Sequence, residues 1–95
     1  MAIRFVWDKK KAEANLRKHD VSFEEAVAVF QDPLARIHDD PDHSQGEQRA
    51  IIVGHSADGR LLLVAFVEHE EAIRIISARR ATRHEQKDYE EGTKK

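Results

Sequence analysis

The 95-residue chain predicts a small α+β domain with the order β-α-α-β-β-β-β-α and a mainly antiparallel sheet packed with helices. Two capping boxes, Ser22–Glu25 and Thr82–Glu85, mark helix starts, because the hydroxyl and the carboxylate of each box satisfy backbone N–H groups. Residues 61–67 are apolar at every position, which is typical of a central strand covered on both faces. We expect one domain over residues 1–92, followed by a frayed tail at 93–95.

The first half of the chain predicts a strand, two helices and a second strand. Asp8 is placed to cap the first helix, whose polar side, including Asn15, is expected to be solvated surface. Ser22 caps the second helix, which ends at the helix-breaking pair Asp32-Pro33. The predicted elements are a strand at 3–7, helices at 9–18 and 23–31, a strand at 34–38 and a loop at 39–46.

The second half predicts three consecutive strands and a last helix. Asp58-Gly59 supplies a tight turn between the first two of these strands. Gly92 is the expected stop of the helix, because glycine commonly follows a helix end. The predicted elements are strands at 48–56, 60–68 and 72–79, and a helix from 82 to 91.

Composition excludes several classes of protein and of site. Because the chain has no cysteine, it has no disulfide framework, thiolate nucleophile or cysteine-ligated zinc, which fits a cytoplasmic protein. No secretory signal is apparent near the N-terminus, and the longest apolar run, residues 61–67, is too short to span a bilayer. Charged residues make up 36% of the chain but the formal net charge is -2, so net charge alone does not indicate nucleic-acid binding.

Basic residues nevertheless cluster late in the chain, whereas residues 39–42 are acidic. Arg79 and Arg80 end a β-branched strand just before the helix start at Thr82, and this position holds their guanidinium groups in place. A planar, permanently charged group held in this way suits phosphate binding. The alternative is that both arginines pair with surface carboxylates. The late basic cluster consists of Arg74, Arg79, Arg80, Arg83 and Lys87.

Several segments match, in order, the sequence pattern of one known family. They are Phe5-Val6-Trp7-Asp8 with Lys11 and Asn15; Lys18-His19-x-Val21-Ser22-Phe23-Glu24-Glu25-Ala26; Val29-Phe30-x-Asp32-Pro33; Asp42-His43-Ser44-x-Gly46-Glu47-x-Arg49; and Ile73-Arg74-Ile75-Ile76-Ser77-Ala78-Arg79-x-Ala81-Thr82 with Glu85 and Tyr89. Together they resemble the BrnT family of toxins from type II toxin–antitoxin systems, which have a RelE-like ribonuclease fold. The resemblance spans nearly the whole chain, from Phe5 to Glu91.

The resemblance implies metal-independent RNA cleavage without a cofactor, in which the 2′-OH of the RNA attacks the neighbouring phosphate. Such a site needs a base, an acid and cations that hold the charged phosphorane. Arg79 is the expected phosphate clamp, with a structural ion pair as the alternative. Glu47 and Arg49 share one strand face and are a candidate acid–base group and cation, or else a cross-strand salt bridge. His43 is a candidate base or acid, or else a solvated loop residue, and no metal-ligand spacing is present.

Arg80, Lys18, His19 and Tyr89 are candidates for contact with RNA, each with a structural alternative. Arg80 follows Arg79 and therefore points to the opposite strand face. Lys18 and His19 end the first helix, where positive charge favours the helix dipole. Tyr89 either stacks on a base or packs the last helix onto the sheet.

Two positions depart from the family pattern. Asp20 stands where the family usually has a glycine in the left-handed conformation, which aspartate tolerates at some cost. His69 stands where the family often has an arginine near the end of the long strand, and it is a candidate catalytic residue that replaces a fixed guanidinium only in part. The alternative to an active ribonuclease is therefore a catalytically weakened or inactive antitoxin-binding module of the same fold.

The resemblance also implies a partner. In the family, the toxin is neutralised by a cognate ribbon-helix-helix antitoxin of the BrnA type, and the complex represses its own operon, so that contact with DNA is indirect. Relatives suggest a heterotetramer of two toxins and two antitoxins. We expect a cytoplasmic protein with RNA as its substrate and no membrane association.

Overall fold

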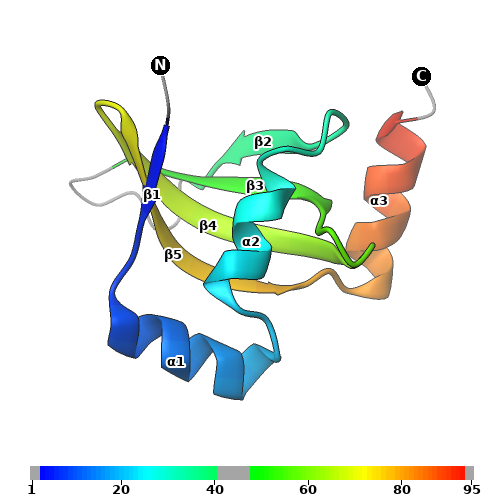
Figure 1. Ribbon diagram of the computed structural model, residues 1–95. Coiled ribbons are helices and arrows are strands. Elements are labelled where there is room, and N and C mark those ends of the chain that lie inside the picture. The colour runs from blue at the N-terminus through cyan, green and yellow to red at the C-terminus, as the bar shows by residue number, and fades with distance from the viewer. Residues whose placement is uncertain (1–2, 41–47, 94–95) are drawn as a thin grey trace.

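The computed structural model describes residues 3–40 and 48–93. It confirms the predicted fold class, with helices and strands in the predicted order (Figure 1). The elements are β1 (Arg4–Val6), α1 (Lys9–His19), α2 (Phe23–Val29), β2 (Arg36–Asp39), β3 (Arg49–His55), β4 (Leu61–His69), β5 (Ala72–Arg80) and α3 (Arg83–Thr93).

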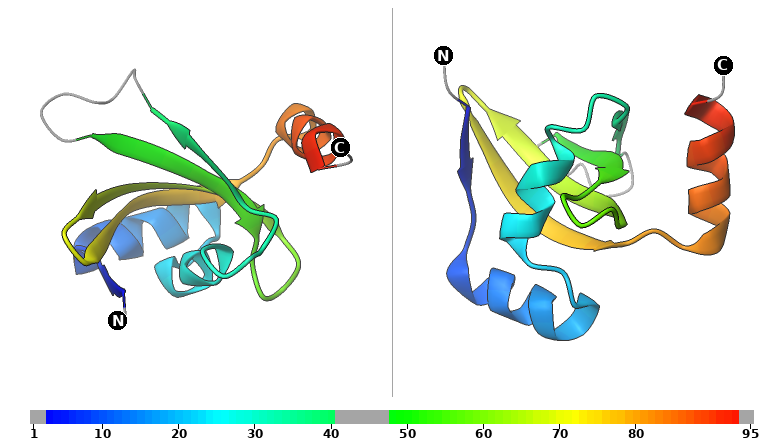
Figure 2. Two further views of the ribbon diagram at one scale, coloured as in Figure 1. Left: turned by 90° about the horizontal axis from the view of Figure 1, so that it is seen from above. Right: turned by 45° about the vertical axis from the view of Figure 1, so that its right-hand side comes forward.

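The sheet has five strands in the order β1-β5-β4-β3-β2. The strands from β2 to β5 form an antiparallel meander, while β1 pairs in parallel with β5. We call the face that α1 and α2 cover the helical face; it carries Ile52, Leu62, Val64 and Ile75. We call the other the open face; α3 lies against one end of it (Figure 2), and it carries Ile51, Leu63, Ala65, Ser77 and Arg79.

The main core lies between α2 and the helical face. Phe23, Ala26 and Val29 are fully buried because they recur at helical spacing and face the apolar side chains of β4 and β5. Trp7 meets Phe23 edge to face, with ring centroids 5.9 Å apart. Both aromatic side chains therefore belong to the core.

The central strand β4 is covered on both faces only in part. On the open face, Leu61 packs with Val53 and Tyr89 under α3. Farther along the strand, Leu63 and Ala65 are only half-buried, because α3 ends its contact there. The apolar run at 61–67 identified the central strand correctly, but full coverage was wrong, and the uncovered part forms the floor of the site described below.

A β-bulge at Ile76 decides where Arg79 points. Ile75 pairs with Phe66 and Ser77 pairs with Ala65, so Ile76 is an extra residue in β5. Strict alternation would have put residue 79 on the same face as Ile75, whereas the extra residue moves Ser77 and Arg79 to the open face. The bulge therefore delivers a charged side chain to solvent rather than to the core.

Asn15 does not lie on a solvated surface, as the sequence pattern predicted, but is 7% exposed. Its side-chain amide donates to the carbonyls of Val21 and Ala78, at 2.9 and 2.8 Å, and its Oδ1 accepts from the Ala78 N–H at 3.1 Å. Strand β1 pairs with β5 only as far as Val6, which lies opposite Arg74. The part of β5 around Ala78 therefore has no neighbouring strand on that side. The Asn15 amide takes the place of that neighbour and fixes the backbone next to Arg79.

Three local predictions need correction at α2 and β2. Ser22 caps α2 as predicted, but the Glu25 carboxylate bonds the Arg60 guanidinium, since an ionised donor makes the stronger hydrogen bond. Helix α2 ends at Val29, two residues before the predicted end. Strand β2 starts at Arg36 because the Asp32 carboxylate accepts from the Leu34 N–H and its carbonyl from the Ala35 N–H, which makes a turn first.

Of the two helix ends predicted at Asp20 and Gly92, the structure confirms the first and not the second. Asp20 closes α1 at φ 58 and ψ 36, so aspartate adopts the left-handed conformation expected there. Gly92, in contrast, is not a stop, because α3 continues to Thr93 and Gly92 does not have a positive φ. A Cβ at Gly92 would collide with the Arg36 guanidinium, so glycine permits this arginine to lie against the helix.

Candidate functional site

Cationic side chains surround the uncovered part of the open face. Strand register places three cross-strand rows there, and residues paired in antiparallel register point to the same face. The rows are Arg74–Val67–Arg49, then Ser77–Ala65–Ile51–His38, then Arg79–Leu63–Val53–Arg36. Neighbouring strands are about 4.8 Å apart, so the residues at the two ends of a four-strand row are about 14 Å apart at Cα. The face thus has a floor of small and aliphatic residues with basic residues on its margins.

Arg79 is held by α3 on one edge of its guanidinium. Nη1 and Nη2 donate to the two carboxylate oxygens of Glu85 at 2.9 and 2.8 Å, and Nη1 also donates to the Arg80 carbonyl at 3.2 Å. Glu85 is itself fixed by the predicted capping box, since it accepts from the Thr82 N–H at 2.8 Å and its own N–H donates to the Thr82 hydroxyl. The structural alternative for Arg79, an ion pair with a carboxylate, is therefore present.

The ion pair leaves the other edge of the guanidinium available. A guanidinium has five N–H donors, and Glu85 and Arg80 use three of them, all on Nη1 and the near side of Nη2. Within residues 3–40 and 48–93, the Nε–H and the second Nη2 hydrogen have no partner. These two donors are parallel and match two oxygens of a phosphate. Arg79 is 41% exposed, so an anion can reach this edge from solvent.

The charges of the pair stabilise each other. The hydrogen bonds from Arg79 lower the pKa of the Glu85 carboxyl to about 2, against the opposing effect of burial and with help from the Thr82 N–H. The Glu85 carboxylate in turn raises the pKa of Arg79. Both groups are therefore ionised at neutral pH, and the orientation of the arginine is fixed before any ligand arrives.

Lowering the pH is expected to remove the stability that this ion pair contributes. Because folding lowers the pKa of Glu85 from 4.5 to about 2, the contribution is complete above about pH 4.5 and is lost as the pH falls toward 2. The side chains are 41% and 30% exposed, so screening by solvent limits it to about 1 kcal/mol. Urea denaturation should show wild type more stable than Glu85→Gln at neutral pH, with the difference shrinking toward about pH 2.5. A stability difference between wild type and Glu85→Gln that does not change with pH would contradict the assignment of the lowered pKa to Glu85.

Arg79 and Arg49 line the same shallow hollow of about 260 Å³, together with Asp40, Ser77 and the aliphatic floor. The structure thus brings Arg49 close to Arg79, on the open face. Both arginines have interactions, and those of Arg79 with Glu85 fix the orientation of its guanidinium. Glu47 and His43, the other candidates from this part of the sequence, lie outside the described residues.

His38 adjoins this hollow and was missed in the sequence. It lines a second hollow of about 300 Å³ with Arg36, Glu85 and Tyr89, and the two hollows share Ile51 and Leu63. Its imidazole is exposed and can take or give a proton. Alternation of Arg36 and His38 around Ile37 was the only available signal, and it does not distinguish a functional strand from an ordinary edge strand.

Three predicted RNA contacts lie on the other side of the sheet. Arg80 pairs with Leu62 and therefore points to the helical face, where its charge acts on Glu25. Lys18 and His19 occupy the last turn of α1, which packs on the helical face as well. None of the three shares a hollow with Arg79.

His69 and Tyr89 are also separate from the Arg79 hollow. His69 ends β4 on the open face, six residues from the Leu63 that pairs with Arg79, which is about 20 Å along the strand. Tyr89 is 5% exposed, and its hydroxyl donates to the Leu34 carbonyl at 3.1 Å. Tyr89 thus has the packing role rather than a free face for stacking.

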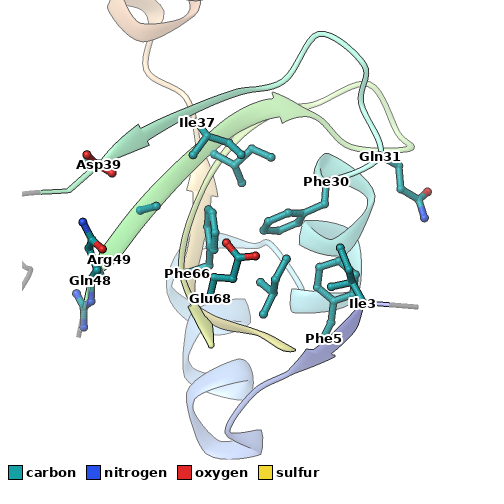
Figure 3. Close-up of a pocket in the computed structure, with 13 residues that line it drawn as sticks. Ile3, Phe5, Phe30, Gln31, Ile37, Asp39, Gln48, Arg49, Phe66 and Glu68 are labelled. Carbon is teal, nitrogen blue, oxygen red and sulfur yellow. The ribbon is translucent and has the colours of Figure 1, made fainter. Parts of the chain in front are cut away.

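The helical face contains a larger groove, of about 750 Å³, in the part that α2 does not cover (Figure 3). Its floor is aromatic and aliphatic: Phe30 packs between Phe5 and Phe66, with ring centroids 5.1 and 5.0 Å apart. Two exposed carboxylates, Asp39 and Glu68, also line it. This groove is on the other side of the sheet from Ser77 and Arg79, and Arg49 is the one cationic side chain among the described residues that line it.

The described residues contain neither a cluster of metal-ligating side chains nor a membrane-spanning helix. In residues 3–40 and 48–93, no group of three or more histidine, aspartate and glutamate side chains is arranged to hold a metal ion. Over the same ranges, no helix has the length and apolar character needed to cross a membrane.

Comparison with known proteins gives one family and one fold. A family model described as "Ribonuclease toxin, BrnT, of type II toxin-antitoxin system" matches residues 7–85, which include both Arg79 and Glu85. The crystal structure of the Brucella abortus ribonuclease toxin BrnT, at 1.1 Å resolution, superposes with a TM-score of 0.67 at 20% sequence identity. That match covers 86% of this chain and 100% of the Brucella chain, and it shows the same fold. No curated protein sequence matches this chain.

Proposed function

Since this chain belongs to the BrnT family of ribonuclease toxins of type II toxin–antitoxin systems, we propose that it cleaves RNA without a metal ion, at the open face. The observation that carries the proposal is the orientation of the Arg79 guanidinium. Glu85 holds one edge of its guanidinium, and the Nε–H and remaining Nη2 donors point away from that pair with no partner among the described residues. Arginine frequently binds a phosphate group through two parallel donors of this kind.

The proposed reaction uses the RNA itself as the nucleophile. A base takes the proton of the 2′-OH, the new 2′-O–P bond forms, the P–O5′ bond breaks, and an acid protonates the leaving 5′-oxygen. The products are a 2′,3′-cyclic phosphate and a 5′-OH. Negative charge on the phosphoryl oxygens increases in the transition state, where the fixed Arg79 donors stabilise it more than in the bound substrate.

The proton transfers need side chains near Arg79. His38 borders the neighbouring hollow and is our candidate within the described residues. Glu47 and His43 remain candidates from the sequence. His69 is about 20 Å along β4 from the residue that pairs with Arg79, so we do not assign it a proton transfer in the same step.

The same family membership supports a protein partner. As a type II toxin, the chain is paired with a protein antitoxin, and we propose that this is a ribbon-helix-helix protein of the BrnA type in a complex of two toxins and two antitoxins. The toxin then meets DNA only through that partner, and both act in the cytoplasm.

A second candidate function is an antitoxin-binding module with weak or no ribonuclease activity. The observation that favours it is the Glu85 carboxylate, which compensates the charge of Arg79 in the unbound protein. In addition, the nearest other cation in the cross-strand row of Arg79 is Arg36, whose Cα is about 14 Å away.

One experiment separates the two functions. The purified chain is incubated in excess EDTA with an end-labelled RNA, and with the same oligonucleotide carrying 2′-deoxy substitutions at the cleaved positions. We expect cleavage of the RNA to a 2′,3′-cyclic phosphate in EDTA, and none at the substituted positions. Intact RNA from folded protein, with and without ribosomes, would favour the antitoxin-binding module, whereas cleavage only with added metal would contradict the mechanism.

A further inference from the structure

The groove on the helical face is an apolar surface that the fold leaves uncovered. It lies between the end of α2, strand β1 and strand β2 (Figure 3). Ile3 and Ile37, on its opposite sides, are 56% and 63% exposed, among the highest values for large apolar side chains in the described residues. Between them lies the aromatic floor of Phe5, Phe30 and Phe66. A contiguous apolar surface of this kind commonly marks an interaction site.

The charges of the groove indicate what kind of partner fits. Glu68 points its carboxylate over the aromatic floor, and Asp39 lies near the end of the groove that Arg49 also borders (Figure 3). Neither carboxylate has a hydrogen-bond or ion-pair partner among the described residues, whereas Arg49 does have an interaction within the fold. RNA is disfavoured here because its phosphates would meet two carboxylates. An apolar protein segment with a lysine or arginine is complementary, since the alkyl stem of that residue packs on the rings and its charge reaches the carboxylates.

We propose that this groove binds an apolar, basic segment of the antitoxin. The proposal rests on the family membership stated above, which supplies a protein partner, but it does not require that this chain cleave RNA. Because the groove and Arg79 lie on opposite faces of the sheet, antitoxin binding and RNA cleavage depend on different side chains, apart from Arg49, which borders both the groove and the Arg79 hollow. The structure thus predicts variants that escape the antitoxin and keep the activity of the free toxin.

The test uses the purified 95-residue chain and, as the probe, the antitoxin encoded beside it. Ile37→Asp places a charge at the rim, and Glu68→Lys reverses a charge over the floor. Leu34→Asp is the matched control, because Leu34 is 60% exposed but does not line the groove. Binding is measured by calorimetry at low and high salt, RNA cleavage is measured without antitoxin, and the oligomeric state of the toxin alone is measured by light scattering.

We expect Ile37→Asp and Glu68→Lys each to weaken antitoxin binding by tenfold or more, with the Glu68→Lys effect larger at low salt. Leu34→Asp should bind like wild type, and all three variants should match wild type in RNA cleavage without antitoxin. In cells, the two groove variants should arrest growth despite co-expressed antitoxin. Wild-type affinity in both groove variants would overturn the proposal, as would an equal loss in Leu34→Asp. Self-association of the toxin that Ile37→Asp abolishes would also overturn it and assign the groove to a second copy of the chain.

Failure of this proposal is distinguishable from failure of the proposed ribonuclease activity. If wild type leaves RNA intact but the groove variants lose antitoxin affinity, the docking surface stands and the catalytic proposal falls. If wild type cleaves RNA but the groove variants bind antitoxin normally, the catalytic proposal stands and the docking surface falls.

Discussion

Replacing Arg79 with alanine is expected to lower kcat/KM for RNA cleavage by about 100- to 1,000-fold, the usual cost of losing one fixed donor that stabilises transition-state charge. The loss has two parts. The phosphate loses the Nε–H and second Nη2 donors. The Glu85 carboxylate, whose charge the Arg79 guanidinium balanced, remains on the open face and repels the substrate. The variant should change kcat more than KM, because the negative charge on the phosphoryl oxygens increases toward the transition state.

Arg80→Ala is the matched control for this effect. It removes the same charge from the next residue, but from the opposite face of β5, so cleavage should change by less than about threefold. Circular dichroism and thermal melting of each variant establish that the domain is folded. Wild-type cleavage by Arg79→Ala would remove this arginine from the mechanism, and an equal loss in Arg80→Ala would point to general charge instead.

Replacing Asn15 with alanine is expected to lower the free energy of unfolding by about 3 kcal/mol. Two carbonyls and one N–H, of Val21 and Ala78, lose their hydrogen-bond partner in a buried position, at roughly 1 kcal/mol each. For a domain of this size, that is a fall in Tm of more than about 10 °C. Urea denaturation and calorimetry measure both quantities.

Lys18→Ala is the control on the same helix, since Lys18 is exposed in its last turn and should change stability by less than about 0.5 kcal/mol. Asn15→Asp should be at least as destabilising as Asn15→Ala at neutral pH, because its buried carboxylate can accept from the Ala78 N–H but would repel the Val21 and Ala78 carbonyl oxygens. Stability within 1 kcal/mol of wild type in Asn15→Ala would mean that water or a backbone shift replaces the three bonds. Because Ala78 precedes Arg79, the same variant should also lose activity if it stays folded.

Local signals predicted most of the fold. The Thr82–Glu85 capping box, the Ser22 cap and the left-handed Asp20 were all confirmed, because each depends on a few neighbouring residues. The 61–67 apolar run likewise located the central strand. Element ends were less accurate, since they depend on competing contacts such as the Asp32 turn before β2.

The sequence predictions that failed concern residues whose roles depend on contacts between distant segments of the chain. Asn15 has the polarity of a surface residue, and only the free edge of β5, 63 residues away in sequence, makes it a buried residue. The bulge at Ile76 cannot be recognised from alternation, yet it sets the face of Arg79. Gly92 has the signature of a helix stop, but α3 continues past it and the Arg36 side chain from β2 lies against it. His38 was missed because an exposed histidine on an edge strand becomes notable only when its neighbours across the sheet are known.

The central claim is that the free edge of Arg79 contacts the phosphate of the RNA. It is tested most directly by a ¹H–¹⁵N NMR titration of the arginine Nε–H signals with an uncleavable, 2′-deoxy-substituted oligonucleotide, with Arg79→Lys used to assign the signal. We predict that the Arg79 Nε–H signal shifts with ligand concentration, while that of Arg80, on the opposite face, does not move. An unchanged Arg79 signal at saturation, with shifts at other arginines, would contradict the account and move the phosphate site elsewhere.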